Sequence, residues 1–346
     1  MGEKVQKIQN AIKEGMVMGG GSWSSDRYTR ATRSRVKSGK AHFGYHADVR
    51  AGRARGVHED LDPTKMRNHI RESRDSDEHP ESLPVMMIFD VTGSMGRIPQ
   101  VLQEKLPNLM DIIIDKAGVE HPQVLVGAIG DWYADNYPFQ IGQFESDNRF
   151  DEQLRNIILE GGGGGQIKES YGLAYRFAAR HTETDSFEKR GKKGYLFTMG
   201  DESFWPSLRS DEVSTIFGIE ASEEESVESL IREAQEKWEL FHLFAMDGSY
   251  PHSTDVHEDW KNVLGERFVK VEDSSLVCEI IASLIFALES SKEIDEVVST
   301  LGIEMADQDK IKKAIVPVVS AIPPSHTADG GLPAGHSGTD EPMTRV

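Results

Sequence analysis

The sequence from Pro84 to Met95 reads P-V-M-M-I-F-D-V-T-G-S-M, an apolar run that ends abruptly in an acidic residue. Residues 85–89 are all large and apolar, a pattern typical of a central strand buried on both faces of a parallel sheet. Asp90 would then stand at the carboxyl end of that strand. Open α/β sheets place their ligand sites at this edge, so the run indicates both a fold and the position of a site.

Two hydroxyl residues, Thr92 and Ser94, follow Asp90 at alternate positions, and Gly93 between them lets the backbone turn. One carboxylate and two hydroxyls offer converging hard oxygens, which suit Mg²⁺ or Mn²⁺ better than a soft metal. The same residues are also compatible with a buried strand that runs into an Asx or Ser turn and binds no metal.

Downstream, apolar runs of strand length alternate with segments of helical periodicity, as in a parallel sheet covered by helices on both faces. We therefore predict an α/β domain over residues 83–290, with a Rossmann-like, doubly wound and mostly parallel sheet of six strands. After the first strand, the others are expected at residues 124–129, 139–144 (a short edge strand), 195–199, 240–246 and 268–271.

The pattern D-x-T-x-S at Asp90, Thr92 and Ser94 resembles the metal-ion-dependent adhesion site of von Willebrand factor A domains, in their cytosolic bacterial and phage-like branch. The glycine run 161–165 before Glu169 is similar to a second metal loop of that family. Asp201 follows the fourth expected strand, where the family places its last metal-site aspartate. The resemblance implies a Mg²⁺ or Mn²⁺ ion among Asp90, Thr92, Ser94, Asp201 and either Gln166 or Glu169.

Two of these assignments stay open. Family members often have a Thr in the middle loop, but residues 161–172 contain none, so Gln166 and Glu169 are the oxygen-bearing candidates. Glu169 is equally compatible with the first turn of a following helix, where the helix dipole favours an acid. Asp131 follows the second expected strand; it would act on the ion through a water, or simply cap the turn before Trp132.

The resemblance also implies a function. An ion held by few charges seeks a further carboxylate, which a partner protein's Asp or Glu would supply, so the chain is expected to be a binding module and not an enzyme. Related cytosolic proteins often work with AAA+ ATPases of the MoxR or chelatase kind, which suggests an assembly or adaptor role.

One enzymatic alternative starts from the same residues. The D-x-T-G pattern at Asp90 is similar to that of haloacid-dehalogenase-like phosphatases and P-type pumps, in which Asp90 would be the phosphoryl-accepting nucleophile. The soluble phosphatases usually need a second Asp where Thr92 stands. They also have a further acid where Phe204 and Trp205 lie in this chain.

Residues 1–82 show little amphipathic periodicity and are predicted to form an extended or partly ordered arm. Residues 27–55 contain nine Lys or Arg against one acid, so this segment carries +8 in a chain whose net charge is −19. The arm could bind nucleic acid, which would make the chain a structural or nucleic-acid-associated protein. It could equally lie on the acidic body of its own chain.

The remaining segments are expected to be a helical extension over residues 291–322 and a disordered tail over residues 323–346. The single cysteine, Cys278, indicates a reducing compartment. The sequence has neither an apolar run of membrane-spanning length nor the apolar core of a signal peptide. We therefore expect a cytoplasmic protein without membrane association.

Overall fold

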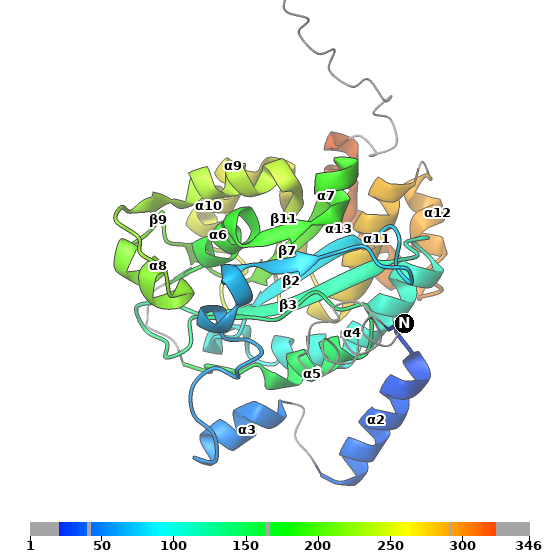
Figure 1. The fold of residues 1–346 in the computed structure, drawn as a ribbon. Helices are drawn as coiled ribbons and strands as arrows, with labels where there is room; N and C mark the ends of the chain where they lie inside the picture. The colour runs from blue at the N-terminus through cyan, green and yellow to red at the C-terminus, as the bar shows by residue number, and fades with distance from the viewer. Residues whose placement is uncertain (1–20, 40–42, 163–166, 291, 323–346) are drawn as a thin grey trace, which may run out of the picture.

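The structure, a computed structural model, describes residues 21–39, 43–162, 167–290 and 292–322. A six-stranded sheet lies at its centre, with helices on both faces (Figure 1). The spatial order is β4-β3-β2-β7-β11-β12, and every neighbouring pair is parallel except β3 and β4. In chain order this is the 3-2-1-4-5-6 arrangement of doubly wound folds, which reverses direction between β2 and β7. The predicted fold class is confirmed.

The strands of this sheet begin and end within a few residues of the predicted ones. They are β2 (Leu83–Asp90), β3 (Pro122–Ile129), β4 (Phe139–Ile141), β7 (Gly194–Gly200), β11 (Trp238–Ala245) and β12 (Phe268–Val271). Six short strands form three two-stranded ladders: β1 (Arg71–Ser73) with β6 (Thr182–Thr184), β5 (Lys168–Glu169) with β8 (Ser203–Phe204), and β9 (Ser207–Leu208) with β10 (Glu225–Ser226).

Strand β2 is buried along its whole length because both faces of the sheet are covered. Val85, Met87 and Phe89 point into one apolar core, whereas Met86 and Ile88 point into the other. This alternation is what a strand imposes on successive side chains, and it explains why the run contains no polar residue before Asp90.

The helices divide between these two cores. On the side of Phe89 lie α4 (Ile98–Asp115), α5 (Arg149–Asn156), α11 (Val277–Glu289), α12 (Ile294–Ser299) and α13 (Met305–Ala321). On the side of Ile88 lie α6 (Gly172–Arg180), α8 (Ser210–Phe217), α9 (Val227–Lys237) and α10 (Thr254–Leu264). The remaining helix of the body is α7 (Asp185–Arg190), and the short 3₁₀ turns are η1 (Pro63–Lys65), η2 (Arg67–His69), η3 (Gly93–Met95), η4 (Gly265–Arg267) and η5 (Ser274–Leu276). None of the helices in the described ranges has the length and apolarity needed to cross a bilayer.

The N-terminal segment, predicted to be extended or partly ordered, contains two helices in its described part, α2 (Ser25–Lys37) and α3 (Gly44–Arg50). It is tied to the body by side chains that precede or flank these helices. The indole of Trp23 donates a hydrogen bond to Asp111 (2.8 Å), and Phe43 is buried in the same core as the apolar residues of α4 and α5. These contacts join residues far apart in sequence, which is why local periodicity did not reveal them.

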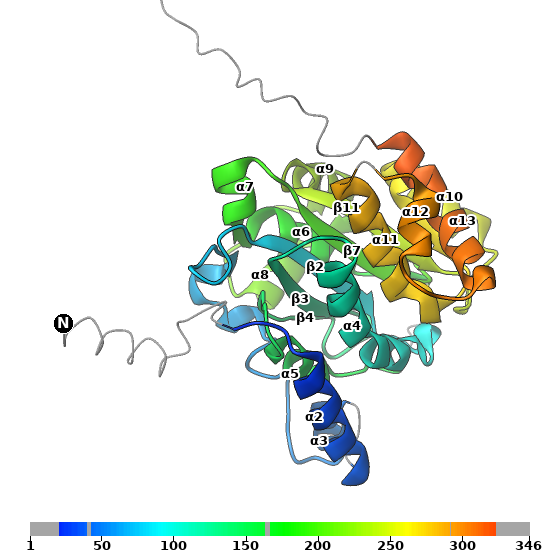
Figure 2. The same cartoon turned by 90° about the vertical axis from the view of Figure 1, so that its right-hand side faces the viewer.

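Helix α2 extends away from the body (Figures 1 and 2). Within the basic segment 27–55, Arg35 forms an ion pair with Asp151 of the body (3.0 Å), and Arg53 pairs with Asp48 inside the segment itself. The other basic side chains of α2 are exposed, namely Arg27, Arg30, Arg33 and Lys37. Contact with the acidic body therefore neutralises only part of the positive charge of the basic segment.

The C-terminal extension consists of α12 and α13, and α13 packs against α11. Residues 323–346, predicted to be a disordered tail, lie outside the described residues, as does residue 291.

We predict that Phe197→Ala lowers the free energy of unfolding by about 3–5 kcal/mol, because it leaves a cavity in a closed core. Phe197 lies on central strand β7, is 1% exposed and stacks on Phe241. Urea denaturation monitored by circular dichroism would measure the change. Val316→Ala, at a side chain 42% exposed on α13, is the matched control and should shift stability by less than about 0.5 kcal/mol. Equal losses in the two variants would contradict this packing.

Candidate metal centre

Asp90 ends strand β2 with a side chain that is 0% exposed. Its Oδ1 accepts hydrogen bonds from the backbone N–H of Thr92 (2.7 Å) and from the Thr92 hydroxyl (2.6 Å). Its Oδ2 is buried and accepts no hydrogen bond from any described residue. A buried carboxylate oxygen without a partner destabilises the folded state, because it has lost its hydration and gained no hydrogen bond. A bound cation or hydrogen-bond donor from outside the chain would compensate for this loss.

The predicted residues Thr92, Ser94 and Asp201 come together beside Asp90. The hydroxyl oxygens of Thr92 and Ser94 are 3.1 Å apart, and the Ser94 hydroxyl donates to Asp201 Oδ1 (2.7 Å). Asp201 follows β7, the neighbour of β2 at the reversal of strand order. The oxygens of two strand ends and one turn therefore meet at the switch point of the sheet.

A loop that the sequence did not implicate closes over Asp201. The backbone N–H of Ser249 donates to Asp201 Oδ2, and the Ser249 hydroxyl donates to the carbonyl of Ser94 (2.9 Å). Only glycine fits at position 248, because a Cβ there would lie 2.5 Å from Asp201 Oδ2. This loop follows β11, and its Asp247 accepts hydrogen bonds from Ser274.

The start of the glycine run lies against the turn that contains Thr92 and Ser94. The backbone N–H of Gly93 donates to the carbonyl of Gly162 (2.7 Å), and a Cβ at Gly93 would lie 2.7 Å from the same oxygen. The two loops are thus adjacent. Residues 163–166 lie outside the described residues, so Gln166 as a ligand stays a prediction.

Glu169 does not lie in the first turn of a helix. It belongs to β5, which pairs with β8 so that Glu169 stands opposite Phe204, and helix α6 begins at Gly172. The pairing with a strand 35 residues away holds the backbone extended, a constraint that helix propensity does not register. The Glu169 side chain is buried, and its Oε2 has no hydrogen-bond partner in the described ranges.

Sequence reasoning missed two buried neighbours, Glu202 and Tyr171. Glu202 follows Asp201 directly, and a second acid at a strand end was the available signal. The Tyr171 hydroxyl lies beneath the site, because a Cβ at Gly200 would lie 1.6 Å from that oxygen and 3.2 Å from the Cβ of Asp90. No local pattern in the sequence places Tyr171 there.

Burial and mutual repulsion raise the pKa values of these carboxyl groups. Burial raises the pKa of Asp90 well above its ordinary value, and the charges of Asp201 and Glu202 add to the effect. Burial, with the charges of Asp90 and Glu202, raises the pKa of Glu169 to about 12. Burial, with the charge of Asp201, raises the pKa of Glu202 to about 7. Across the described part of the chain, no cationic side chain pairs with any of the four, so a bound cation is the natural compensation.

The donor set fits a hard divalent cation. Among the described residues, no group of three or more His, Cys, Asp or Glu side chains is arranged as a metal site on its own. The arrangement instead combines the free Oδ2 of Asp90 with two hydroxyls and the Asp201 carboxylate. Oxygen donors of this kind suit Mg²⁺ or Mn²⁺, and they would leave coordination positions for water or another ligand.

Asp131 has a structural role in this arrangement. Its Oδ1 accepts from the indole N–H of Trp205 (2.9 Å) and from the backbone N–H of Tyr133 (3.2 Å). It thereby holds the Tyr133 and Trp205 rings together, with centroids 4.6 Å apart. Tyr133 is 48% exposed, whereas Phe204 is buried against Trp260.

No protein-family model matches the sequence, and no curated protein matches it. Solved structures with a similar fold include the pilus adhesin SpaC of Lactobacillus rhamnosus GG, at 9% identity and a TM-score of 0.42 over 63% of this chain and 32% of the adhesin. Proximal thread matrix protein 1 of the mussel byssus, determined with a zinc-occupied MIDAS motif, matches at 11% identity and a TM-score of 0.39 over 60% of this chain and 47% of its own. The matched region is thus a third to a half of those proteins. Similarity this distant carries no inference about the metal centre, which rests on the chain's own residues.

We predict that the stability of the metal-free protein falls as pH rises from about 4.5 to about 7, in part because of Glu202. The folded protein holds a proton on Glu202 that the unfolded chain has already lost, so folding is favoured below this window and penalised above it. Between pH 5 and 8, the free energy of unfolding of Glu202→Gln should therefore fall by about 2 kcal/mol less than that of the wild type.

Urea denaturation in EDTA at several pH values would measure this difference. The exposed Glu78→Gln variant is the matched control and should follow the wild-type pH dependence. If the free energy of unfolding had the same pH dependence in the wild type and in Glu202→Gln, the pKa of Glu202 would not be raised in the folded protein.

Proposed function

We propose that this chain is a von Willebrand A-type protein-binding module, in which Mg²⁺ or Mn²⁺ bound by Asp90, Thr92, Ser94 and Asp201 docks a carboxylate of a partner protein. The observation that carries the proposal is the buried Oδ2 of Asp90, which has no hydrogen-bond partner among the described residues. It lies among further carboxyl groups and beside two hydroxyls, and none of these neighbours neutralises it.

The donor set favours docking over catalysis. Mg²⁺ requires near-octahedral coordination, and the four side chains above do not fill it, so a ligand from outside can bind. Glu169 holds its proton through burial and through the charges of Asp90 and Glu202, so before an ion binds it adds no further negative charge. An Asp or Glu of a partner would then complete both the coordination and the charge balance.

The surface beside this centre suits a protein partner. Tyr133 and Ile167 are exposed, and Trp205 is partly exposed between Tyr133 and the Lys168 ammonium, which lies 5.7 Å from its ring. Aromatic anchors next to a buried polar contact are typical of interface hot spots. A lysine at the rim would favour an acidic segment.

The finer assignments rest on the resemblance alone. A MoxR- or chelatase-like AAA+ ATPase as partner, and an intracellular assembly or adaptor role, stay predictions. The phosphatase alternative requires Asp90 to attack a phosphoryl group in line, and its fully buried side chain weighs against this.

A second candidate function, binding of nucleic acid through residues 27–55, is favoured by the exposed arginines of α2. It predicts retention on nucleic acid that falls steeply with salt and is lost when residues 27–55 are deleted. Binding measured by fluorescence anisotropy at several salt concentrations would test this. Equal retention of the full chain and the deletion variant would remove this candidate.

We predict that Mg²⁺ or Mn²⁺ titrated into the wild-type protein gives a saturable heat by isothermal calorimetry. Asp90→Ala should abolish it, because Asp90 contributes both charge and the free oxygen. Asp77→Ala, at an exposed acid outside the centre, should bind as the wild type does.

The open coordination position can be tested on the Mn²⁺-loaded protein. Manganese-bound water enhances water-proton relaxation, and a capped Gly-Asp-Gly peptide should reduce that enhancement, whereas a Gly-Asn-Gly peptide should not. An absence of heat in the folded wild type would contradict the metal site. Metal binding with no effect of the Asp peptide would contradict docking.

A further inference from the structure

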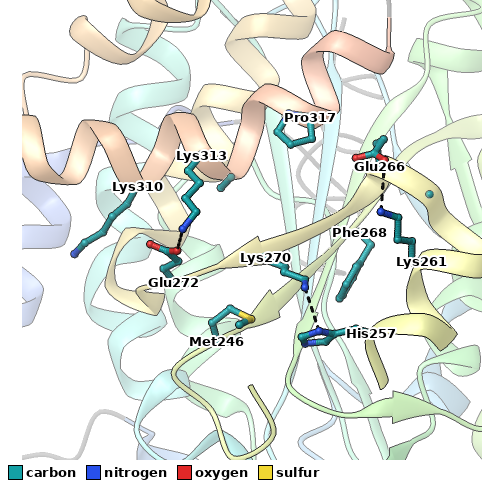
Figure 3. Close-up of a pocket in the computed structure, with 12 residues that line it drawn as sticks. Met246, His257, Lys261, Glu266, Phe268, Lys270, Glu272, Lys310, Lys313 and Pro317 are labelled. Carbon is teal, nitrogen blue, oxygen red and sulfur yellow. Dashed lines mark hydrogen bonds and ion pairs between the residues drawn. The ribbon is translucent and has the colours of Figure 1, made fainter. Parts of the chain in front are cut away.

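A groove of about 390 Å³ lies beside β12, the last strand of the sheet (Figure 3). It is lined by residues of α10, η4, β12 and α13, together with Met246, which follows β11, and Glu272, which follows β12. None of its lining residues belongs to the candidate metal centre. The groove is therefore separate from the metal centre, and the proposed docking function does not explain it.

The outer edge of β12 faces this groove. Within the described residues, β12 pairs with β11 and with no other strand. The carbonyl of Val271 accepts from the backbone N–H of Met246 (2.9 Å), so it points toward β11. Because backbone polar groups alternate sides along a strand, the N–H and carbonyl of Lys270 point outward. An edge that presents such groups is a template for another strand.

The helices on either side limit what can pair there. His257 and Lys261 of α10 line one wall, whereas Lys313 and Pro317 of α13 line the other. Neighbouring strands lie about 4.8 Å apart, so an added strand would run inside the groove, between these walls. The walls favour a single extended chain over the edge of a second sheet.

Charge selects the kind of chain. Four lysines and two glutamates line the groove in a chain of net charge −19. Three of these lysines have acidic partners: Lys313 pairs with Glu272, Lys310 pairs with Asp273 (2.8 Å), and Lys261 lies 4.0 Å from Glu266. Lys270 instead contacts Nδ1 of His257 (3.1 Å), so its ammonium is available to an incoming acid (Figure 3).

The groove also has apolar parts. Met246, Phe268 and Pro317 lie around it (Figure 3). The two walls, α10 and α13, pack into the cores on opposite faces of the sheet. A strand added to β12 would present alternate side chains to the two walls. Alternating apolar and acidic residues would match both the apolar surface and the ammonium of Lys270.

We propose that the β12 edge groove is a β-augmentation site, which binds an extended acidic segment of a partner protein as a seventh strand. Main-chain hydrogen bonds to Lys270 supply the pairing, and the ammonium of the same residue selects for an acidic residue. The site is independent of the metal centre, so it binds its segment in EDTA as well as in Mg²⁺.

The test uses the full-length protein and a fluorescein-labelled, capped probe peptide, Ser-Val-Glu-Val-Glu-Val-Glu-Ser, whose binding is followed by anisotropy in EDTA. We expect saturable binding that weakens about tenfold or more in Lys270→Glu. Lys65→Glu, at an exposed lysine outside the groove, is the matched control and should bind as the wild type does. A peptide with Lys in place of Glu should not bind.

Two N-methylated forms of the peptide test for strand pairing. Methyl groups on one set of alternate residues block one edge of the peptide, and those on the other set block the opposite edge. Augmentation requires that only one form loses binding. Equal binding of both forms, or equal binding by Lys270→Glu and the wild type, would overturn the proposal. A full chain that does not bind the peptide, but sediments as a dimer that Lys270→Glu dissociates, would identify a second copy as the occupant and overturn it as well.

Discussion

The burial of β2 on both faces is the constraint on which the rest of the site depends. Every residue from Leu83 to Asp90 is buried, so the strand cannot shift in register without moving apolar side chains out of two cores. Asp90 is thereby fixed in a buried position beside the end of β7, which Asp201 follows directly. These two acids stand at the ends of adjacent strands with no cationic partner in the described ranges, and a divalent ion can balance their charge.

Much of the fold and the core of the site could be predicted, because these depend on local patterns. The run that ends in Asp90 sets its own strand, and Thr92 and Ser94 follow within one turn. Asp201 was predicted from the family resemblance, and the structure brings it to Asp90 because parallel strands place their carboxyl ends at one edge.

The parts that could not be predicted depend on contacts between distant residues. Glu169 is in a strand because it pairs across from Phe204, and Tyr171 reaches the site only because position 200 is glycine. Ser249 closes over Asp201 from a loop that follows another strand. The N-terminal helices are anchored by Trp23 and Phe43, single aromatic residues that leave no periodic signal.

The central claim is that the oxygens of four side chains bind one divalent cation, namely those of Asp90, Thr92, Ser94 and Asp201. Anomalous diffraction from crystals grown with Mn²⁺ tests it most directly, because it locates the ion without reference to activity or to a partner. A single manganese peak among these four side chains, absent from crystals of Asp90→Ala, is the expected result. Wild-type crystals without a peak there, at a manganese concentration that occupies other sites, would contradict the claim.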